Sequence, residues 1–291
     1  MDGIKSEAEA KGMMAVDQNS AEGLMDDYVD ILAEVTALCA VQDPVEKPYD
    51  SKYKARKLLD NLVNKLEATK TVSMMEGRRE TVTEMKWRVA ACQVKLGIIS
   101  YEVEEPHNAQ IDLELAASFY SPDFVQEISD IVGPDLGEGE DGAADSAGAP
   151  PAVVSLADPP DVCLPKNNLV ICIDAMQCLN MMGILWAGRG AVQKSFLYLE
   201  AANRLYQKGQ VHTSKLNAHS PATERRKAKD MESVYTHNLF YLAQAHGHVG
   251  DTQKSGLYVK CLCVSVSVSV CVCTRLLVFA LASTSYFQQS A

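Results

Sequence analysis

The stretch that decides the fold is "MGILWAGRGAVQKSFLYLEAANRLY", residues 182–206. It holds two apolar runs with helical spacing, and the glycines between them predict a turn. Gly183 follows the large residue Met182, and the next small residue of the pattern, Ser195, comes 12 positions later. Two helices that cross closely need a small residue at the contact, with a large residue in the groove beside it. The stretch therefore predicts an antiparallel helix pair.

Two further segments repeat this pattern, residues 95–117 and 239–259. In all three segments a small residue follows a large apolar one, and the next small residue lies 12 positions later. The aligned positions are Leu96, Gly97, Ala109, Leu113 and Ala116; Met182, Gly183, Ser195, Leu199 and Ala202; and Leu242, Ala243, Ser255 and Val259. This arrangement resembles the tetratricopeptide repeat, although the segments start 86 and 60 residues apart. The alternative is a generic helical bundle in which the small residues coincide by chance.

Apolar stripes with helical spacing also predict helices outside these segments. Ser51 is the expected N-cap of the helix that starts there. The expected helices cover residues 21–40, 51–70, 83–103, 108–128, 167–190, 191–209 and 231–248. No strand pattern precedes residue 257. The sequence thus predicts an all-α fold of tetratricopeptide-like antiparallel helix pairs that form a short solenoid.

Composition divides the chain into three parts. We expect a disordered N-terminus (1–20), a helical-repeat domain (21–258) and a low-complexity tail outside the fold (259–291). Within the domain, residues 134–161 are rich in acids, Gly, Ala and Pro, so they cannot bury enough apolar area to order themselves. This acidic segment and the polar segment 209–222 are predicted loops.

Charge and cysteine content restrict the class of protein. The net charge is −11, which disfavours nucleic acid or an anionic membrane surface as partner and is compatible with a basic protein partner. The N-terminus has no apolar signal segment. Five of the nine cysteines are scattered without paired spacing, as expected for buried reduced thiols in a cytoplasmic protein.

Three stretches carry a more specific resemblance: "EKPYDSKYKARKLL" (46–59), residues 182–206, and "VYTHNLFYLAQ" (234–244). They resemble the KIF-binding protein family, which consists largely of such repeats, over roughly residues 25–258. Tyr235, Thr236, His237 and Asn238 match although repeat packing does not dictate them. The resemblance implies a cytoskeleton-associated cytoplasmic protein that binds kinesin motor domains and regulates microtubule-based transport. Family members are longer, so it also implies a truncated form that corresponds to their N-terminal part.

The resemblance and the repeat pattern together suggest where a partner would bind. First helices of such repeats line a groove, and their polar and aromatic residues are the candidates. The candidate partner-binding residues are Gln177, Asn180, Tyr235, His237, Asn238 and Phe240. In "YTHN", Tyr235, His237 and Asn238 either face a partner or hold neighbouring helices in register. The main alternative function is a general tetratricopeptide-repeat adaptor for another peptide partner.

No motif predicts catalysis, a cofactor or a metal. Residues 188–195, "GRGAVQKS", approach a phosphate-binding loop, but Gln193 stands where the second glycine belongs and the preceding segment is helical. His246 and His248 lie in the predicted turn of the last repeat, without ligands at metal spacing, and are expected to be solvated. Binding the acidic C-terminus of a partner, as some repeat co-chaperones do, would need a lysine on the first helix of a repeat. None occurs at the corresponding positions of this sequence. We therefore expect a non-enzymatic protein.

The tail contains "CLCVSVSVSVCVC" (261–273), in which apolar and small residues alternate as in a strand. A membrane anchor is the first alternative, although Arg275 interrupts the apolar run and a span needs about 20 residues. A metal site would need a turn between the two cysteine pairs. Alternating Val, Ser and Cys codons also match a GT-rich DNA repeat. Since the resemblance stops at Tyr258, we expect residues 259–291 to be translated intron. The last repeat would then lack most of its second helix, and its apolar groove would be open.

Overall fold

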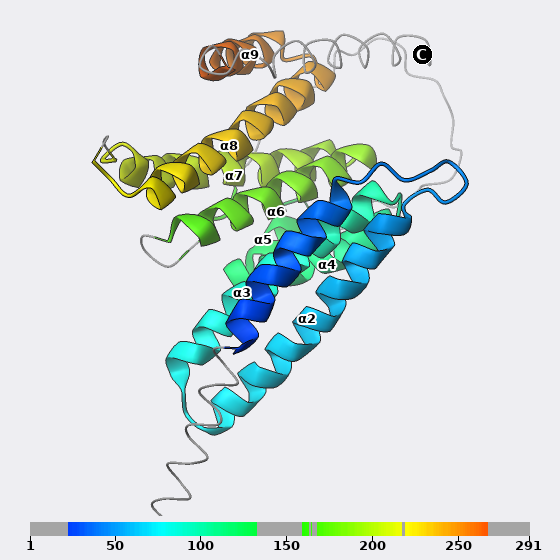
Figure 1. The fold of residues 1–291 in the computed structure, drawn as a ribbon. Coiled ribbons are helices and arrows are strands. Elements are labelled where there is room, and N and C mark those ends of the chain that lie inside the picture. Colours follow the sequence, from blue (N-terminus) through cyan, green and yellow to red (C-terminus); the bar gives the residue numbers. More distant parts are fainter. Residues whose placement is uncertain (1–22, 133–158, 163, 165–167, 217–218, 267–291) are drawn as a thin grey trace, which may run out of the picture. The chain divides into compact units, whose positions relative to one another are not determined.

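The computed structural model describes residues 23–132, 159–162, 164, 168–216 and 219–266. All regular elements among these residues are helices, and consecutive helices form hairpins (Figure 1). The predicted all-α fold of antiparallel helix pairs is confirmed. The predicted disordered N-terminus (1–20), most of the acidic loop and the end of the tail lie outside the described residues. The chain divides into two compact units, Met1–Phe119 and Tyr120–Ala291, each of which is described by itself.

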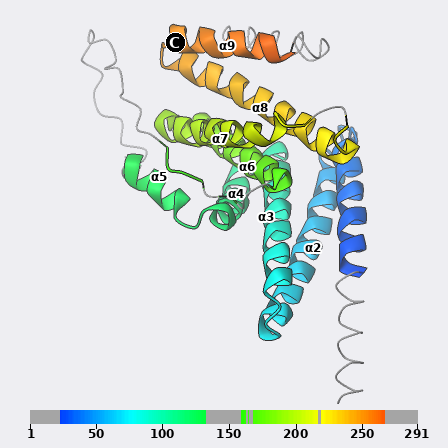
Figure 2. The ribbon, with the colours of Figure 1, turned by 90° about the vertical axis from the view of Figure 1, so that its left-hand side faces the viewer.

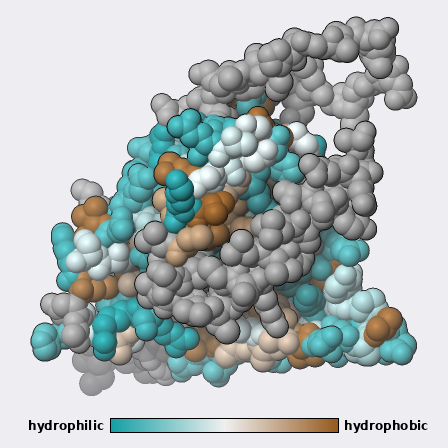
Figure 3. Space-filling model, turned by 90° about the horizontal axis from the view of Figure 1, so that it is seen from above, coloured by the Kyte–Doolittle hydropathy of each residue, from teal (hydrophilic) through white to brown (hydrophobic). Residues whose placement is uncertain are grey.

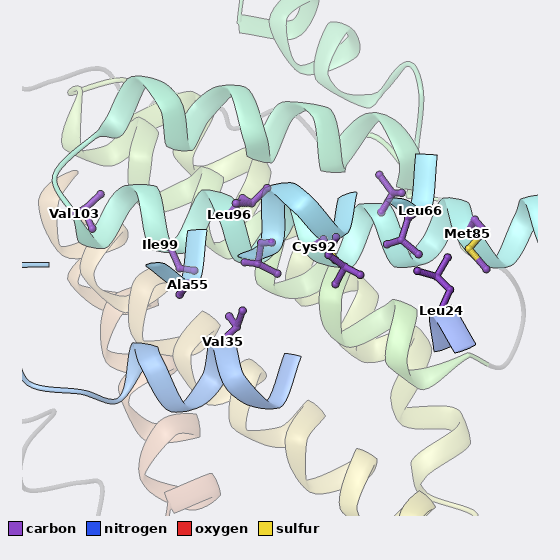
Figure 4. Packing of buried hydrophobic residues seen from close by; sticks show 12 residues of the cluster. Leu24, Val35, Ala55, Leu66, Met85, Cys92, Leu96, Ile99 and Val103 are labelled. Atoms are coloured by element: carbon purple, nitrogen blue, oxygen red, sulfur yellow. The ribbon is translucent and has the colours of Figure 1, made fainter. Parts of the chain in front are cut away.

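The first unit contains a helix over residues 23–39, then α2 (Asp50–Met75), α3 (Arg79–Glu102) and α4 (Pro106–Tyr120). Side chains of the first helix, α2 and α3 converge on one core (Figure 4). On α2 the buried apolar residues recur every three or four positions, as one face of a helix requires. The buried core residues are Leu24, Val35, Ala55, Leu59, Leu62, Leu66, Met85, Val89, Cys92, Leu96, Ile99 and Val103.

The start of α2 differs from the predicted cap. The prediction of Ser51 as N-cap is wrong, because the helix begins at Asp50 and Tyr49 occupies the cap position with a positive φ of 70°. Asp43 supplies the capping oxygen instead. Its Oδ2 accepts hydrogen bonds from the Ser51 backbone N–H at 3.0 Å and from Ser51 Oγ at 2.6 Å. A carboxylate from the preceding segment thus satisfies a free amide of the first turn.

The second unit contains α5 (Phe124–Val132), α6 (Leu169–Gly188), α7 (Val192–Thr213), α8 (Ala222–His248) and α9 (Thr252–Val266). Helix α8 packs against both α6 and α7, as a repeat solenoid requires (Figures 1 and 2). Asn168 caps α6, because its side chain accepts hydrogen bonds from the amides of Val170 and Ile171. The expected single helix over 108–128 is broken between α4 and α5, where Pro122 cannot donate a backbone hydrogen bond.

Two helices of the second unit extend beyond the boundaries expected from the sequence. Helix α7 continues to Thr213, through the start of the expected loop 209–222. Met231 approaches it closely at Gly209, where a Cβ would lie 2.9 Å from the Met231 sulfur. At the end, α9 crosses the expected tail boundary at residue 259 and continues to Val266. Residues 261–266 are therefore helical despite their alternation. The end of the predicted acidic loop contacts α7, because Arg204 donates a hydrogen bond to the Pro159 carbonyl at 3.2 Å.

Four hairpin turns share one backbone conformation. In each, one residue adopts a positive φ, its N–H bonds to the carbonyl three positions back, and the next N–H bonds to the carbonyl five positions back, as in a Schellman motif. The positive-φ residues are Gly77, Glu104, Gly190 and Gly250, with φ of 72°, 64°, 76° and 76°. The turns after α3, α6 and α8 keep the 86- and 60-residue spacing of the sequence repeat. The turn between α2 and α3, which the sequence pattern missed, adds a fourth copy.

Among the described helices, α6 is long and apolar enough by length and composition to cross a membrane. Within the protein, however, 67% of its apolar window is buried. A core helix that is covered on most sides passes the same test, so this is weak evidence for a membrane span. The alternative of a tail anchor concerns mainly residues 267–291, which lie outside the described part of the chain.

The cysteines of the described residues are all free thiols. Cys92, Cys172 and Cys178 are buried, as predicted, whereas Cys39 is half-buried. Burial raises the pKa of Cys172 to about 11, so this thiol stays protonated at neutral pH. Cys163 lies outside the described residues.

Candidate partner-binding surface

The small residues of the sequence pattern lie at the helix contacts that were predicted for them. A Cβ on Gly97 would lie 2.5 Å from Leu113 Cγ, and a Cβ on Gly183 would lie 2.6 Å from Leu199 Cγ. Both leucines therefore occupy the space that a larger residue would need. Because the same geometry occurs in both hairpins, the pattern reflects packing rather than chance.

The third hairpin keeps the register but changes the contact. Ser255, the counterpart of Ser195, donates its Oγ hydrogen to the Ala243 carbonyl at 2.9 Å. This hydrogen bond joins α8 to α9 at Ala243, the position that glycine holds in the two earlier hairpins. The three segments are therefore one structural repeat with a polar variation in the last copy.

Of the six candidate residues, Gln177, His237 and Phe240 reach the surface of the first helices α6 and α8, and Tyr235 is half-buried against Tyr206 of α7. Gln177 and Phe240 are half-buried, and His237 is exposed. The His237 imidazole Nδ1 lies 2.9 Å from the Ser233 carbonyl, and the Phe240 ring packs edge-on against Tyr241 at 5.6 Å. We name these three residues the first-helix face. They combine hydrogen-bonding groups with an aromatic ring, a mixture typical of protein-binding surfaces.

Asn180 and Asn238 lie in the interior, where they join three helices. The Asn238 Nδ2 group donates to Asn180 Oδ1 at 2.8 Å and to the Leu199 carbonyl at 2.9 Å. Asn180 Nδ2 donates to the Val234 carbonyl at 3.3 Å. Both side chains are buried. Of the two roles left open for "YTHN", Asn238 performs that of holding neighbouring helices in register.

Tyr235 also contributes to helix packing. Its ring stacks on Tyr206 of α7 with centroids 3.5 Å apart, and its hydroxyl donates to Asn203 Oδ1 at 3.3 Å. Burial raises the pKa of Tyr235 to about 12. The hydroxyl is therefore protonated at neutral pH and acts as a donor.

Residues 188–195, whose sequence partly matches a phosphate-binding loop, form the turn between α6 and α7 and the start of α7. Lys194, which would have to reach a phosphate, is buried and lies 4.0 Å above the Trp186 ring. Ser195 is buried at the α6–α7 contact. A lysine over an indole face is a cation–π contact, so this residue stabilises the hairpin.

The expectation that both histidines of the last turn are solvated is wrong for His246. Its side chain is only about 5% exposed and lies between the rings of Phe196 and Tyr258, at 4.5 and 5.4 Å. The Asp251 carboxylate is 3.6 Å from its Nδ1. Burial lowers the pKa of His246, so the ring is neutral at pH 7. His248 is exposed, and the described residues contain no group of three or more His, Cys, Asp or Glu that could hold a metal.

A polar cluster in the first unit was not predicted from the sequence. Tyr49 and Tyr53 at the start of α2 donate to Glu104 and Glu105, at 3.2 and 3.0 Å. Arg56 pairs with Glu105 at 2.5 Å. The stretch "EKPYDSKYKARKLL" thus meets the α3–α4 turn through its tyrosines and arginine. The signal was present in the i, i+4 spacing of the tyrosines, but their acidic partners lie about 50 positions away.

The chain is similar to proteins named KIF-binding protein, as the sequence resemblance indicated. It is 35% identical to the Xenopus tropicalis protein over 92 residues, which are 28% of this chain and 15% of that protein. It is 32% identical to the Homo sapiens protein over 104 residues, 33% of this chain and 16% of that protein. The Gallus gallus protein matches at 24% identity over 233 residues, 77% of this chain and 31% of that protein. The chain therefore spans less than a third of the length of these curated relatives.

No family model matches the chain, and no solved structure matches it. The fold and the packing described above therefore rest on the chain's own residues.

Proposed function

We propose that this protein is a non-enzymatic helical-repeat adaptor that binds kinesin motor domains and thereby regulates microtubule-based transport. The observation that carries the proposal is the similarity to proteins named KIF-binding protein, which in one relative extends over 77% of this chain. The helix pairs support it, because repeat helices present rigid surfaces to protein partners. A kinesin-binding adaptor would be cytoplasmic and associated with the cytoskeleton.

The proposed contact surface is the first-helix face: Gln177, His237 and Phe240. Asn180, Tyr235 and Asn238, which were also candidates, would act indirectly by fixing α6, α7 and α8 relative to one another. An exposed surface on well-packed helices loses little conformational freedom on binding. The surface would therefore bind without rearrangement of the hairpins.

The experiment measures binding of the full chain to a purified, labelled kinesin motor domain by fluorescence anisotropy. The variant Gln177→Glu with His237→Glu places two carboxylates on the proposed surface, and we expect it to weaken binding at least ~10-fold. The control Gln207→Glu with Gln210→Glu adds two carboxylates at exposed positions of α7 and should bind as wild type does. Circular dichroism verifies that both variants are folded.

Two outcomes would contradict different parts of the proposal. If the wild-type chain binds none of a panel of kinesin motor domains, the proposed partner is wrong, and the general peptide adaptor gains support. If the wild type binds and both double variants bind equally well, kinesin binding stands but its location on the first-helix face does not.

A further inference from the structure

The positive charge of the chain is concentrated at one end of the α7–α8 pair. Residues 201–229 contain seven Lys or Arg and one acid, although the whole chain has a net charge of −11. Helix α7 ends at Thr213 and α8 begins at Ala222, so these residues flank the connection between the two helices (Figure 1). The seven bases are Arg204, Lys208, Lys215, Arg225, Arg226, Lys227 and Lys229.

Helix α8 runs back along α7, which brings these bases to the same end of the pair. Tyr206 donates to Glu232 Oε1 at 2.7 Å, and a Cβ on Gly209 would lie 2.9 Å from the Met231 sulfur. The residues that precede Met231 therefore lie beside the end of α7. Five exposed bases gather there, and we name them the basic end: Lys208, Lys215, Arg225, Arg226 and Lys229.

Most of the basic end lacks a counter-ion within the described part of the chain. Lys208 pairs with Asp161, whereas Lys215, Arg225, Arg226 and Lys229 form no ion pair with a described residue. Gathered like charges repel one another, so an acidic ligand would stabilise them. On the face that Figure 3 shows, hydrophobic residues are interspersed with hydrophilic ones. Charge is therefore the feature that this end offers to a ligand.

The end of the acidic segment is already bound beside these bases. Asp161 Oδ1 lies 2.9 Å from Lys208 Nζ, and Arg204 donates to the Pro159 carbonyl at 3.2 Å. The hydrogen bond and the charge of Lys208 hold the pKa of Asp161 below its ordinary value. Val162, the next residue, is buried. The described structure thus shows a carboxylate of this segment bound to the basic end.

Further acids of the same segment are within reach. Residues 138–145, "EGEDGAAD", contain four acids, and residues 134–158 contain no base. Asp145 lies 13 positions before Asp158. A chain of that length spans up to about 40 Å, whereas α7 extends only about 8 Å from Lys208 to its last residue. The length of the segment and its charge therefore both fit the basic end.

We propose that the basic end binds residues 138–145 of the same chain as an intramolecular acidic ligand. Their carboxylates pair with Lys215, Arg225, Arg226 and Lys229, and an acidic segment of another protein has to displace them in order to bind there. Single exposed ion pairs are weak, so several act together, supported by the high effective concentration of a tethered ligand. The contact is separate from the first-helix face and does not depend on kinesin binding.

Carbodiimide crosslinking of the full chain tests the contact, because the reagent joins a carboxylate directly to an amine that touches it. At low salt we expect mass spectrometry of the monomer to find residues 138–145 joined to Lys215 or Lys229. About 0.5 M salt should lower the yield at least ~5-fold, because it screens exposed charges. Arg225→Glu with Arg226→Glu should lower it as much. Lys57→Glu with Arg79→Glu reverses two exposed charges of the first unit and, as the matched control, should leave the yield unchanged.

Displacement is measured with a variant whose own acids are neutral: Glu138→Gln, Glu140→Gln, Asp141→Asn and Asp145→Asn. A fluorescein-labelled peptide of residues 135–146 should bind this variant at least ~10-fold more tightly than it binds wild type, in which the basic end is occupied. Equal binding to the two chains would overturn the proposal. So would crosslinks to Lys57 as frequent as those to Lys229, or crosslinks found only in dimers, because the occupant would then be a second copy.

Discussion

The Tyr49 hydroxyl donates a hydrogen bond to Glu104 Oε1 at 3.2 Å, and these two are the non-glycine residues with positive φ in the described part of the chain. Tyr49 precedes α2 and Glu104 follows α3. A positive φ costs free energy in any residue with a Cβ, because the side chain approaches the backbone carbonyl. The two strained positions of the first unit are therefore connected to each other.

Replacing Glu104 by glycine should stabilise the first unit. Glu104 occupies the turn position that glycine holds in the other three hairpins. Relief of the strain outweighs the greater unfolded-chain freedom of glycine, so we expect the free energy of unfolding to rise by ~1 kcal/mol. Urea unfolding followed by the fluorescence of Trp87, with Trp186 replaced by Phe, measures it.

The reciprocal change at an equivalent turn is the control. Gly190→Ala places a Cβ at a φ of 76° and should lower the free energy of unfolding of the second unit by ~1 kcal/mol. A Glu104→Gly chain no more stable than its parent would show that the Tyr49 hydrogen bond compensates fully for the strain.

Gly183→Ala should destabilise the second unit through overpacking. The new Cβ would lie 2.6 Å from Leu199 Cγ and 3.4 Å from the Ser195 carbonyl, so the leucine or the helix must move. Forced shifts of this kind cost ~1–3 kcal/mol. Urea unfolding followed by Trp186 fluorescence measures the loss. Gly188→Ala on the same helix is the control, because nothing lies within 4 Å of its Cβ position.

The repeat spacing made much of this packing predictable. A small residue that follows a large apolar one, with another small residue 12 positions later, marks the hairpins in which the Gly97–Leu113 and Gly183–Leu199 contacts lie. The pattern works because both partners of each contact lie in one hairpin, so short-range spacing encodes the geometry. The helices themselves were predictable for the same reason, because apolar spacing within each segment is enough to indicate a helix.

What sequence reasoning missed depends on partners that are distant in the chain. His246 looked like a turn residue, but Phe196 lies 50 positions earlier and buries it. Asp43 replaced Ser51 as the cap because the preceding segment folds back on the helix. Alternation in 261–266 is typical of a strand, yet these residues continue the helix α9 that pairs with α8 upstream. The sequence does not show that Asn180 and Asn238 are buried whereas His237 is exposed, because this difference depends on how α6, α7 and α8 cross.

Asn238→Ala should destabilise the second unit more than its size suggests. The change removes the donors to Asn180 Oδ1 and to the Leu199 carbonyl. Leu199 lies inside α7, so its carbonyl keeps its helical hydrogen bond, whereas Asn180 Oδ1 is left buried without this donor. Leaving a buried acceptor unsatisfied costs ~1–3 kcal/mol. Urea unfolding of Asn238→Ala, Asn180→Ala and the double variant gives the coupling. Strictly additive losses would mean that the two amides do not act as a pair.

The stability of the second unit should fall as the pH is lowered below about 6.5, the pKa of an ordinary histidine. Burial between Phe196 and Tyr258 lowers the pKa of His246 in the folded chain, and Lys254 lowers it further, while Asp251 opposes the shift. Between the folded and the unfolded pKa the unfolded chain binds more protons, so the free energy of unfolding is largest above the unfolded pKa and decreases toward acid. Urea unfolding followed by Trp186 fluorescence at pH 7.5 and 5.5 measures the slope. His246→Phe should flatten it, whereas His237→Phe, at an exposed position, should retain it. An unchanged slope in His246→Phe would assign the pH dependence to other groups.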